Sequence, residues 1–311
     1  MNSDFSKRRF ASVDEMVANV ECPTPLVRVR SLLKESGAEL YLKLEWMNPF
    51  GSIKDRTAIF LLNGLKEKGC LEGKKIVEPT SGNTGIALVA LANLMGCNCT
   101  ITIPEGVPEE KQILLRLLGC DLMPTPDDLC PIDHPKDGAI ALAHSIVNDP
   151  QTGREYVMPN QYENPDNVKA HYTTTGPEIW NQTDGMIRYF FAGYGTCGTI
   201  TGTAKFLKER NPEIKVIGIM PQKGHKLPGL KNFLESKKPV ILDESLVDET
   251  IIVPDEPAYE MTRRLIRNES LLAGPSTGAV VHAAIEYMKG KSGIAVAISP
   301  DNIFKYMSYL K

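Results

Sequence analysis

Residues 187–210 read IRYFFAGYGTCGTITGTAKFLKER, and this stretch decides the fold class. Its first six residues are rich in aromatic and β-branched side chains, which predicts a buried strand. A glycine-rich turn follows, and the residues from Thr199 onward have the pattern of an amphipathic helix. A strand that passes through such a turn into a helix is the repeating unit of α/β proteins with a mostly parallel sheet.

The same unit recurs on both sides of this stretch. Predicted strands cover 39–44, 75–78, 99–103, 121–124, 187–192, 215–220 and 293–298. Predicted helices cover 57–68, 84–95, 109–118, 137–147, 199–210, 258–269 and 278–288. The units fall into two groups that meet near residue 150, which predicts two doubly wound α/β halves with a ligand between them.

Composition restricts the classes of function. The 311 residues are 42% hydrophobic and 23% charged, as in an ordinary globular protein, and the formal net charge of -3 gives no electrostatic reason to bind nucleic acid. No apolar run reaches the roughly 18 residues of a membrane-spanning helix, and no secretory h-region follows the basic N-terminus. We therefore expect a cytoplasmic protein that acts on small molecules.

The seven cysteines are an odd number scattered along the chain without C-x-x-C spacing. Cys97 and Cys99 are the nearest pair, and they stand where a helix is expected to end and a strand to begin. Reduced thiols and no metal site are the prediction.

Three turns between a strand and a helix have the composition of anion sites, because backbone N–H groups and the helix dipole point toward a ligand there. Residues 78–85 read EPTSGNTG, and their amides and hydroxyls suit a carboxylate. Residues 193–199 read GYGTCGT, and their glycines permit the close approach that a phosphate needs. Residues 273–278 read AGPSTG and open the last long helix.

A lysine stands at the start of another predicted helix, in the segment NPFGSIKDR at 48–56. The positive end of the helix dipole and desolvation both lower the pKa of an amine such as Lys54. A neutral amine is what a Schiff base with a carbonyl requires. Taken alone, a lysine at a helix start is more often a solvent-facing residue.

Together and in this order, four segments resemble the signatures of the β-family, fold type II, of pyridoxal-phosphate enzymes. They are NPFGSIKDRTA, EPTSGNTGIAL, GYGTCGTITG and GPSTGA. The resemblance is to cysteine synthase, also called O-acetylserine sulfhydrylase, and it runs from Pro23 to the last helix. The segment NPDNVKAHYTTTGPEIWNQT at 164–183 resembles the B-type isoform.

The resemblance implies a fold like that of the tryptophan synthase β-subunit. Two doubly wound, mostly parallel-sheet domains would hold pyridoxal 5′-phosphate in the cleft between them. Residues 45–155 would form a smaller mobile domain with the loop for the substrate carboxylate. Residues 12–44 and 156–311 would form the larger domain with the loop for the cofactor phosphate.

The resemblance also implies a role for each matching residue. Lys54 would be the Schiff-base lysine and the base that removes the α-proton. Asn83 would hydrogen-bond the 3′-oxygen of the cofactor, and Ser276 would face its pyridine nitrogen. The cofactor phosphate would be held by Gly195, Thr196, Cys197, Gly198 and Thr199. The substrate α-carboxylate would be bound by Thr80, Ser81, Thr84 and Gln161.

The reaction implied is replacement of the β-substituent of an activated L-serine by sulfide, through an α-aminoacrylate intermediate, to give L-cysteine. The activated serine is O-acetylserine or O-phosphoserine. A cystathionine β-synthase-like enzyme, a diaminopropionate-forming enzyme and a non-catalytic paralogue remain alternatives. The resemblance further implies a homodimer, and the sulfur donor is either free sulfide or a sulfur-carrier protein.

Some segments depart from the family pattern. Cys197 stands where glycine is common, and SPDNIFKY at 299–306 replaces a G-E/D-R-Y-L-S-T segment expected near the cofactor ring. The loop at 222–232 carries His225, Lys226 and Lys231, which either face solvent or pair with a phosphorylated substrate. The proline-rich stretch at 124–136 is expected to be a solvated loop.

Overall fold

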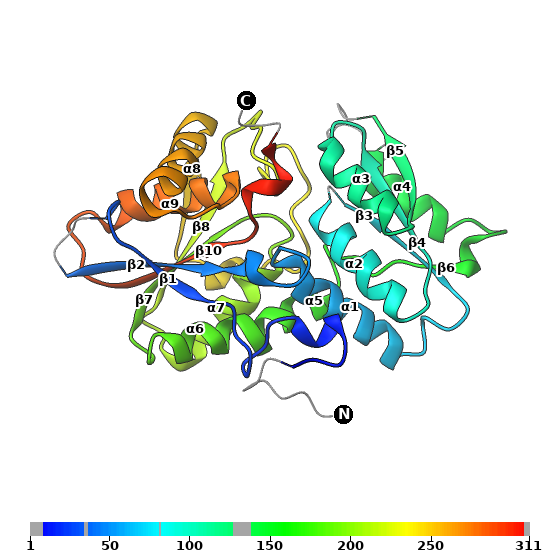
Figure 1. Cartoon of the computed structure of the whole chain (residues 1–311), viewed down its shortest axis with the longest axis horizontal. Coiled ribbons are helices and arrows are strands. Elements are labelled where there is room, and N and C mark those ends of the chain that lie inside the picture. The colour runs from blue at the N-terminus through cyan, green and yellow to red at the C-terminus, as the bar shows by residue number, and fades with distance from the viewer. Residues whose placement is uncertain (1–8, 34–36, 81, 127–137, 308–311) are drawn as a thin grey trace.

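The computed structural model describes residues 9–33, 37–80, 82–126 and 138–307. They form two α/β units that lie side by side, each around its own sheet (Figure 1). The larger sheet has the strand order β1-β2-β10-β7-β8-β9, and the smaller one has the order β5-β4-β3-β6. The predicted fold class, two α/β halves with mostly parallel sheets, is confirmed.

The strands of the two sheets run almost entirely in parallel. Only β1 is antiparallel to its neighbour, β2. The six-stranded sheet contains β1 (Leu26–Val29), β2 (Ala38–Leu44), β7 (Ile187–Gly193), β8 (Lys215–Pro221), β9 (Glu249–Val253) and β10 (Gly293–Ser299). The four-stranded sheet contains β3 (Lys75–Pro79), β4 (Cys99–Pro104), β5 (Asp121–Thr125) and β6 (Tyr156–Val157). Three strands, β1, β6 and β9, were not predicted from the sequence.

The long helices lie where they were predicted. Their bounds are α1 (Lys54–Glu67), α2 (Asn83–Leu94), α3 (Glu109–Leu117), α4 (Gly138–Val147), α7 (Gly198–Arg210), α8 (Asp255–Glu269) and α9 (Pro275–Met288). Helices α1, α2, α7, α8 and α9 begin one to three residues earlier than predicted, α3 begins as predicted and α4 begins one residue later. Because of the earlier starts, candidate site residues occupy first helical turns. Two unpredicted short helices, α5 (Pro165–Ala170) and α6 (Gly176–Gln182), flank a π-helical turn at His171–Thr175.

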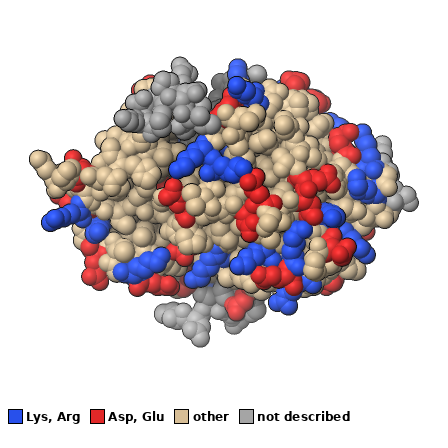
Figure 2. All heavy atoms as spheres, turned by 180° about the vertical axis from the view of Figure 1, so that it is seen from behind, with Lys and Arg blue, Asp and Glu red and all other residues tan. Residues whose placement is uncertain are grey.

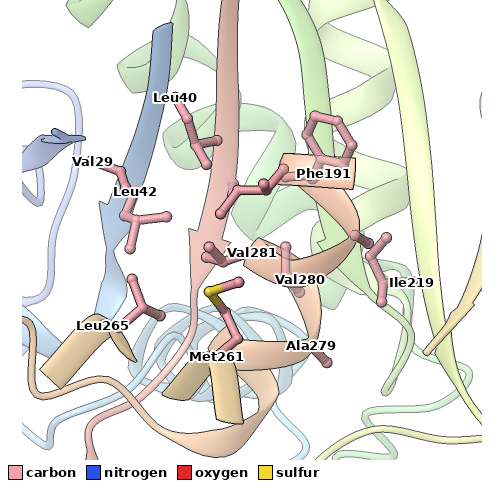
Figure 3. Packing of buried hydrophobic residues seen from close by; sticks show 14 of the residues in the cluster. Val29, Leu40, Leu42, Phe191, Ile219, Met261, Leu265, Ala279, Val280 and Val281 are labelled. Atoms are coloured by element: carbon pink, nitrogen blue, oxygen red, sulfur yellow. The ribbon is translucent and has the colours of Figure 1, made fainter. Parts of the chain in front are cut away.

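One face of the six-stranded sheet is covered by α8 and α9. Leu42 of β2, Phe191 of β7 and Ile219 of β8 point toward these helices (Figure 3). Met261 of α8 and Val280 of α9 fill the space against them. The closely packed layer fixes the start of α9, and with it Ser276, against the sheet.

The other face of the same sheet is covered by α6 and α7. Phe190, next to Phe191 in β7, packs with Ile179 of α6 and with Ile200 and Leu207 of α7. Adjacent strand residues point to opposite faces, so both faces of β7 are buried. This explains why IRYFFA reads as a continuous apolar run rather than an alternating one.

The four-stranded sheet has a separate core with α1, α2 and α3. Ile76, Ile101, Leu62, Leu88 and Leu115 belong to it and are almost completely buried. The domain boundaries at residues 45 and 155 stay a prediction. The four-stranded sheet itself continues to β6, which pairs with β3.

A buried cluster of charges anchors the first turn of α1. Arg56 contacts Glu45 through Nε at 2.7 Å and Glu178 through both terminal nitrogens at 2.5 and 2.7 Å. Lys43 Nζ lies 2.7 Å from Glu178, and the Oγ1 of Thr24 donates to Glu45 at 2.7 Å. Burial alone would raise the pKa of Glu45, but the adjacent guanidinium lowers it to about 2. The cluster therefore stays ionised and ties α1 to β2 and α6.

Asp55 is a second buried charge in the first turn of α1. Its carboxyl accepts hydrogen bonds from the backbone N–H of Phe50 at 2.6 Å and from Ser52 Oγ at 3.3 Å. Burial raises the pKa of Asp55 to about 7. Between pH 4 and 7 the folded state therefore binds a proton that the unfolded state has lost.

This difference predicts that the free energy of unfolding falls as pH rises from 4 to 7. The contribution of Asp55 is fully present below its unfolded pKa and is lost as pH approaches 7; its size is on the order of a few kcal/mol. Asp55→Asn keeps the shape of the side chain but removes its titratable carboxyl group. The free energy of unfolding of this variant is therefore expected to depend less on pH. Urea unfolding of both proteins at pH 5 and pH 7 measures the effect, and equal slopes would contradict it.

The surface carries no single-sign patch on the face seen in Figure 2, where acidic and basic side chains intermingle. This agrees with the small formal net charge of -3. Across the described ranges, no helix has the length and apolarity to cross a membrane. Within the same ranges, no group of His, Cys, Asp or Glu is arranged to hold a metal ion.

Candidate active site

A cleft that is partly open to solvent gathers residues from both units. The elements around it are the starts of α1, α2, α7 and α9. Strands lead directly into α2 and α7, whereas the turn at 273–278, expected to follow a strand, connects α8 to α9. The predicted site residues that line it are Lys54, Thr80, Asn83, Thr84, Gln161, Gly195, Thr196, Cys197, Thr199 and Ser276. Gly198 lies behind the lining, and Ser81 falls outside the described residues.

Lys54 is the first residue of α1 and faces this cleft. Burial lowers the pKa of its amine, while the carboxylates of Asp301 and Glu45 oppose the shift. Among the residues that the structure describes, none accepts a hydrogen bond from its Nζ atom. A half-buried amine with a lowered pKa and a free Nζ is available to a ligand as a base or nucleophile.

The glycine-rich turn before α7 presents backbone donors to the cleft. The N–H groups of Gly195, Thr196 and Cys197 have no acceptor within the described part of the chain. Gly195 also lies so close to the next segment that an added Cβ would stand 2.7 Å from the carbonyl oxygen of Gly229. With the helix dipole of α7 behind them, these donors suit an anion such as a phosphate.

Cys197 explains why glycine is common at its position. Its φ of 68° is left-handed, a conformation that glycine adopts without strain. Burial raises the pKa of the Cys197 thiol to about 12. The thiol therefore stays protonated at neutral pH, and its low reactivity agrees with a small side chain that fills space.

A hydrogen-bond network behind the turn fixes its hydroxyls. Asn167 Nδ2 donates to Thr196 Oγ1 at 3.1 Å, and Thr57 of α1 donates to Asn167 Oδ1 at 3.0 Å. His171 Nε2 lies 3.2 Å from Thr199 Oγ1, and burial lowers the pKa of His171 to about 3. The imidazole is therefore neutral. Neither Asn167 nor His171 was predicted, although both lie in the segment with the closest family resemblance.

The turn before α2 carries the residues predicted for a carboxylate. Thr84 Oγ1 donates to Gln161 Oε1 at 2.7 Å, so the two side chains act as a pair. Glu78 holds Gln161 by accepting its backbone N–H at 3.0 Å, and burial raises the pKa of Glu78 to about 7. The Gln161 amide is fixed further by its bond to the carbonyl of Pro79 at 3.1 Å.

Asn83 and Ser276 stand at two other helix starts in the cleft. Asn83 Nδ2 donates to Asp301 Oδ2 at 2.6 Å, while its buried Oδ1 has no partner in the described part of the structure. Nδ2 also makes a longer hydrogen bond of 3.4 Å to the Tyr306 hydroxyl, a contact that a ligand acceptor could replace. Ser276 is buried in the first turn of α9, and its hydroxyl makes no hydrogen bond with a described residue.

The segment at 299–306, which departs from the family pattern, does reach the cleft. Asp301 and Tyr306 both line it, and the Tyr306 hydroxyl donates to Asp301 Oδ2, which also accepts from Asn83. Asp301 Oδ1 is buried without a partner among the described residues. Of the three cations predicted in the loop at 222–232, only Lys231 lines the cleft, with Nζ 4.6 Å from the ring centroid of Tyr162.

This chain is similar over most of its length to a known family and to proteins of known function. The model of the family described as pyridoxal-phosphate dependent enzyme matches residues 17–299. A cysteine synthase of Aquifex aeolicus (strain VF5) is 41% identical over 295 residues, covering 92% of this chain and 88% of that protein. Cysteine synthase B of Escherichia coli (strain K12) is 36% identical over 287 residues, covering 92% of each.

A solved structure is similar over nearly the whole fold. The hydrogen sulfide-producing enzyme of Fusobacterium nucleatum matches with a TM-score of 0.86 and 32% identity, covering 96% of this chain and 100% of that chain. The similarity therefore includes both units and the cleft between them.

Proposed function

The chain belongs to the family of pyridoxal-phosphate dependent enzymes, and we propose that within it this protein makes L-cysteine from an activated L-serine and sulfide. The observation that carries the proposal is the placement of Lys54 in one cleft with a carboxylate turn and a phosphate turn. The extent of identity with proteins named cysteine synthase supports the same reaction.

The residues of the cleft fit pyridoxal 5′-phosphate. The unpaired N–H groups of Gly195, Thr196 and Cys197 suit its phosphate, and the Asn83 amide, whose contact with Tyr306 is long at 3.4 Å, suits its 3′-oxygen. Ser276 offers a hydroxyl to the pyridine nitrogen and Lys54 an amine to the aldehyde. When bound, the cofactor supplies an electron sink for the α-carbon of an amino acid.

Lys54 moves the proton in the proposed reaction. With Nζ facing the cleft, the Lys54 side chain would lie beside the α-carbon of a bound amino acid, where it would act as general base and later return the proton. Its lowered pKa keeps a larger share of the amine neutral at physiological pH than an exposed lysine would have. Ser276, a neutral hydroxyl, does not stabilise a positive charge on the ring nitrogen as an aspartate would, which suits elimination over prolonged carbanion storage.

The carboxylate turn gives the amino-acid substrate its orientation. Thr80, Thr84 and Gln161 place hydroxyl and amide groups on the side of the cleft formed by the four-stranded sheet. The phosphate turn and Ser276 come from the other unit, so a bound substrate contacts both. We propose that this bridging draws the units together and excludes water from the reacting atoms.

Removing the contacts with the substrate carboxylate is expected to raise the KM for the amino-acid substrate. Thr84→Ala deletes the hydroxyl that holds Gln161, and Gln161→Ala deletes the amide. Each variant loses charge-assisted hydrogen bonds to the substrate carboxylate worth about 1.5–3 kcal/mol, which corresponds to a KM increase of roughly 10- to 100-fold. Steady-state kinetics measure KM, and cofactor absorbance checks that the holoenzyme is intact. Thr203→Ala, which removes a buried threonine of α7 outside the cleft, is the matched control. An unchanged KM in both cleft variants would overturn the assignment.

The family resemblance extends the proposal to a homodimer in the cytoplasm that accepts sulfide free or from a sulfur-carrier protein. Light scattering tests the first point, because a dimer has twice the 34.3 kDa mass of the chain. A monomer at all assay concentrations would contradict it.

The reaction is tested by giving the holoenzyme O-acetylserine, O-phosphoserine or serine, each with sulfide, and measuring cysteine by mass spectrometry. We expect cysteine from at least one activated serine and much less from serine. A Lys231→Met variant separates the two esters, because loss of that cation would weaken O-phosphoserine more than O-acetylserine. Release of sulfide from cysteine without any synthesis from either ester would contradict the proposed function.

A further inference from the structure

Lys111 of α3 places a second lysine in the cleft, apart from Lys54. Its side chain is 3% exposed and lies across the carboxylate turn. A Cβ added at Gly82, whose φ of 129° already favours glycine, would stand 2.5 Å from Lys111 Cδ. The Nζ atom lies 4.1 Å from the ring centroid of Tyr306, which orients the ammonium through a cation–π contact.

The Nζ atom of Lys111 has no hydrogen bond or salt bridge with any residue that the structure describes. Other buried lysines nearby are satisfied: Lys43 pairs with Glu178 at 2.7 Å, and Lys305 donates to the carbonyls of Phe50 and Gly51 at 2.8 and 3.1 Å. Buried charges are normally paired, because leaving one alone in a low dielectric is costly. An unpaired ammonium at the wall of a cleft therefore points to an anionic ligand.

We propose that Lys111, held by Tyr306, binds the small anion that is exchanged at the β-carbon of the substrate. The inference rests on the proposed function, in which one anion leaves and another enters at that carbon. The substrate carboxylate and the cofactor phosphate already have donors in the two turns, and Lys231 is proposed only for a phosphate leaving group, so Lys111 is the unassigned cation that remains among the described cleft residues for the exchanged group. It is either the departing acetate or phosphate or the incoming hydrosulfide.

The role of Lys111 is electrostatic: it forms no covalent bond with the exchanged group. The departing oxygen takes the electron pair of its bond to the β-carbon, and the hydrosulfide later supplies the pair for the new carbon–sulfur bond. Lys111 remains protonated in both steps and stabilises the negative charge on whichever anion is present. It is thus a binding residue for the exchanged group rather than a proton donor.

The charge of Lys111 gives the site a defined pH dependence. Burial lowers the pKa of Lys111 to about 8; Asp301 and Glu110 oppose this shift, and Lys305 reinforces it. The Tyr306 ring covers the ammonium on its other side. The amine is charged below pH 8 and neutral above it, so anion binding should weaken as pH rises through this value.

Calorimetry on the holoenzyme tests the site directly, with inorganic phosphate and acetate as probes and L-alanine present to occupy the carboxylate turn. Lys111→Met removes the charge and keeps the length, and we expect it to weaken binding of at least one probe by about 10- to 100-fold. Lys111→Arg should retain binding and keep it above pH 8. Lys205→Met is the matched control, because Lys205 makes the same kind of contact, 5.5 Å from the Tyr172 ring, on the surface.

Kinetics then identify the anion. A rise in the KM for sulfide alone assigns Lys111 to the nucleophile, and a rise in the KM for the activated serine alone assigns it to the leaving group. Cofactor absorbance equal to wild type shows that Lys111→Met has folded and is loaded. Equal anion affinity and equal KM values in wild type and in a loaded Lys111→Met enzyme would overturn the proposal. Anion binding that depends on Lys111 in a protein that makes no cysteine would instead contradict only the proposed function.

Discussion

Lys54→Ala is expected to lower the rate of cysteine formation by at least about 100- to 10,000-fold, since positioned acid–base groups contribute that much. The variant also loses the amine that would anchor the cofactor, so the absorbance of the bound cofactor should change. Both effects follow from the position of Lys54 at the start of α1, facing the cleft with a free Nζ atom. Enzyme assays and absorbance spectra on the same purified samples measure them.

Lys54→Arg tests whether the positive charge of Lys54 or its ability to become a neutral amine is required. Arginine keeps the positive charge but remains protonated, so it cannot serve as a neutral amine. It should be as inactive as the alanine variant, whereas Lys205→Ala on the surface should behave like wild type. Substantial cysteine formation by a well-folded Lys54→Ala or Lys54→Arg enzyme would exclude Lys54 from catalysis.

Arg56→Met is expected to produce the largest loss of stability. Arg56 is completely buried, and its removal leaves the buried carboxylates of Glu45 and Glu178 without their guanidinium partner, although Lys43 still pairs with Glu178. Breaking a buried ion pair by removing one partner costs about 3–5 kcal/mol, because a charge is left without compensation. Since Arg56 lies two residues after Lys54, the start of α1 should also loosen. Urea unfolding measures the free energy, and cofactor content reports on the site.

Two further variants show whether uncompensated charge is the cause. Neutralising one carboxylate in the same background, as Arg56→Met with Glu45→Gln, should restore part of the lost stability. Arg263→Met removes an exposed pairing with Glu256 and Glu260 and should cost less than about 1 kcal/mol. If Arg56→Met is no less stable than Arg263→Met, the cluster does not anchor α1.

Much of the cleft was predictable because its key residues lie in short local motifs. A strand, a glycine-rich turn and a helix start are encoded by adjacent residues, as in GYGTCGT, and parallel strands bring such turns to one edge of a sheet. This is why Lys54, Thr84, Thr196 and Ser276 were predicted from separate segments and line one cleft. Their individual chemical roles stay predictions that the variants above test.

The contacts that connect distant segments were not predictable in the same way. Asn83 and Asp301 are 218 positions apart, and Arg56 and Glu178 are 122 apart, so no local pattern reveals their pairing. The burial of Lys111 likewise depends on Tyr306, which reaches the cleft from the other end of the chain. Strand β6 has only two residues, and its pairing with β3 rather than its composition defines it, whereas β1 (LVRV) and β9 (ETIIV) have strand-like composition and were missed.

Mapping the covalent attachment of the cofactor tests the central claim most directly. The holoenzyme is reduced with borohydride, digested, and searched by mass spectrometry for a lysine carrying the pyridoxyl group. The geometry predicts the label on Lys54 alone, in the peptide that begins α1. Labelling of Lys111 or Lys231 in place of Lys54, or a reduced protein without any pyridoxyl lysine, would contradict the assignment of this cleft.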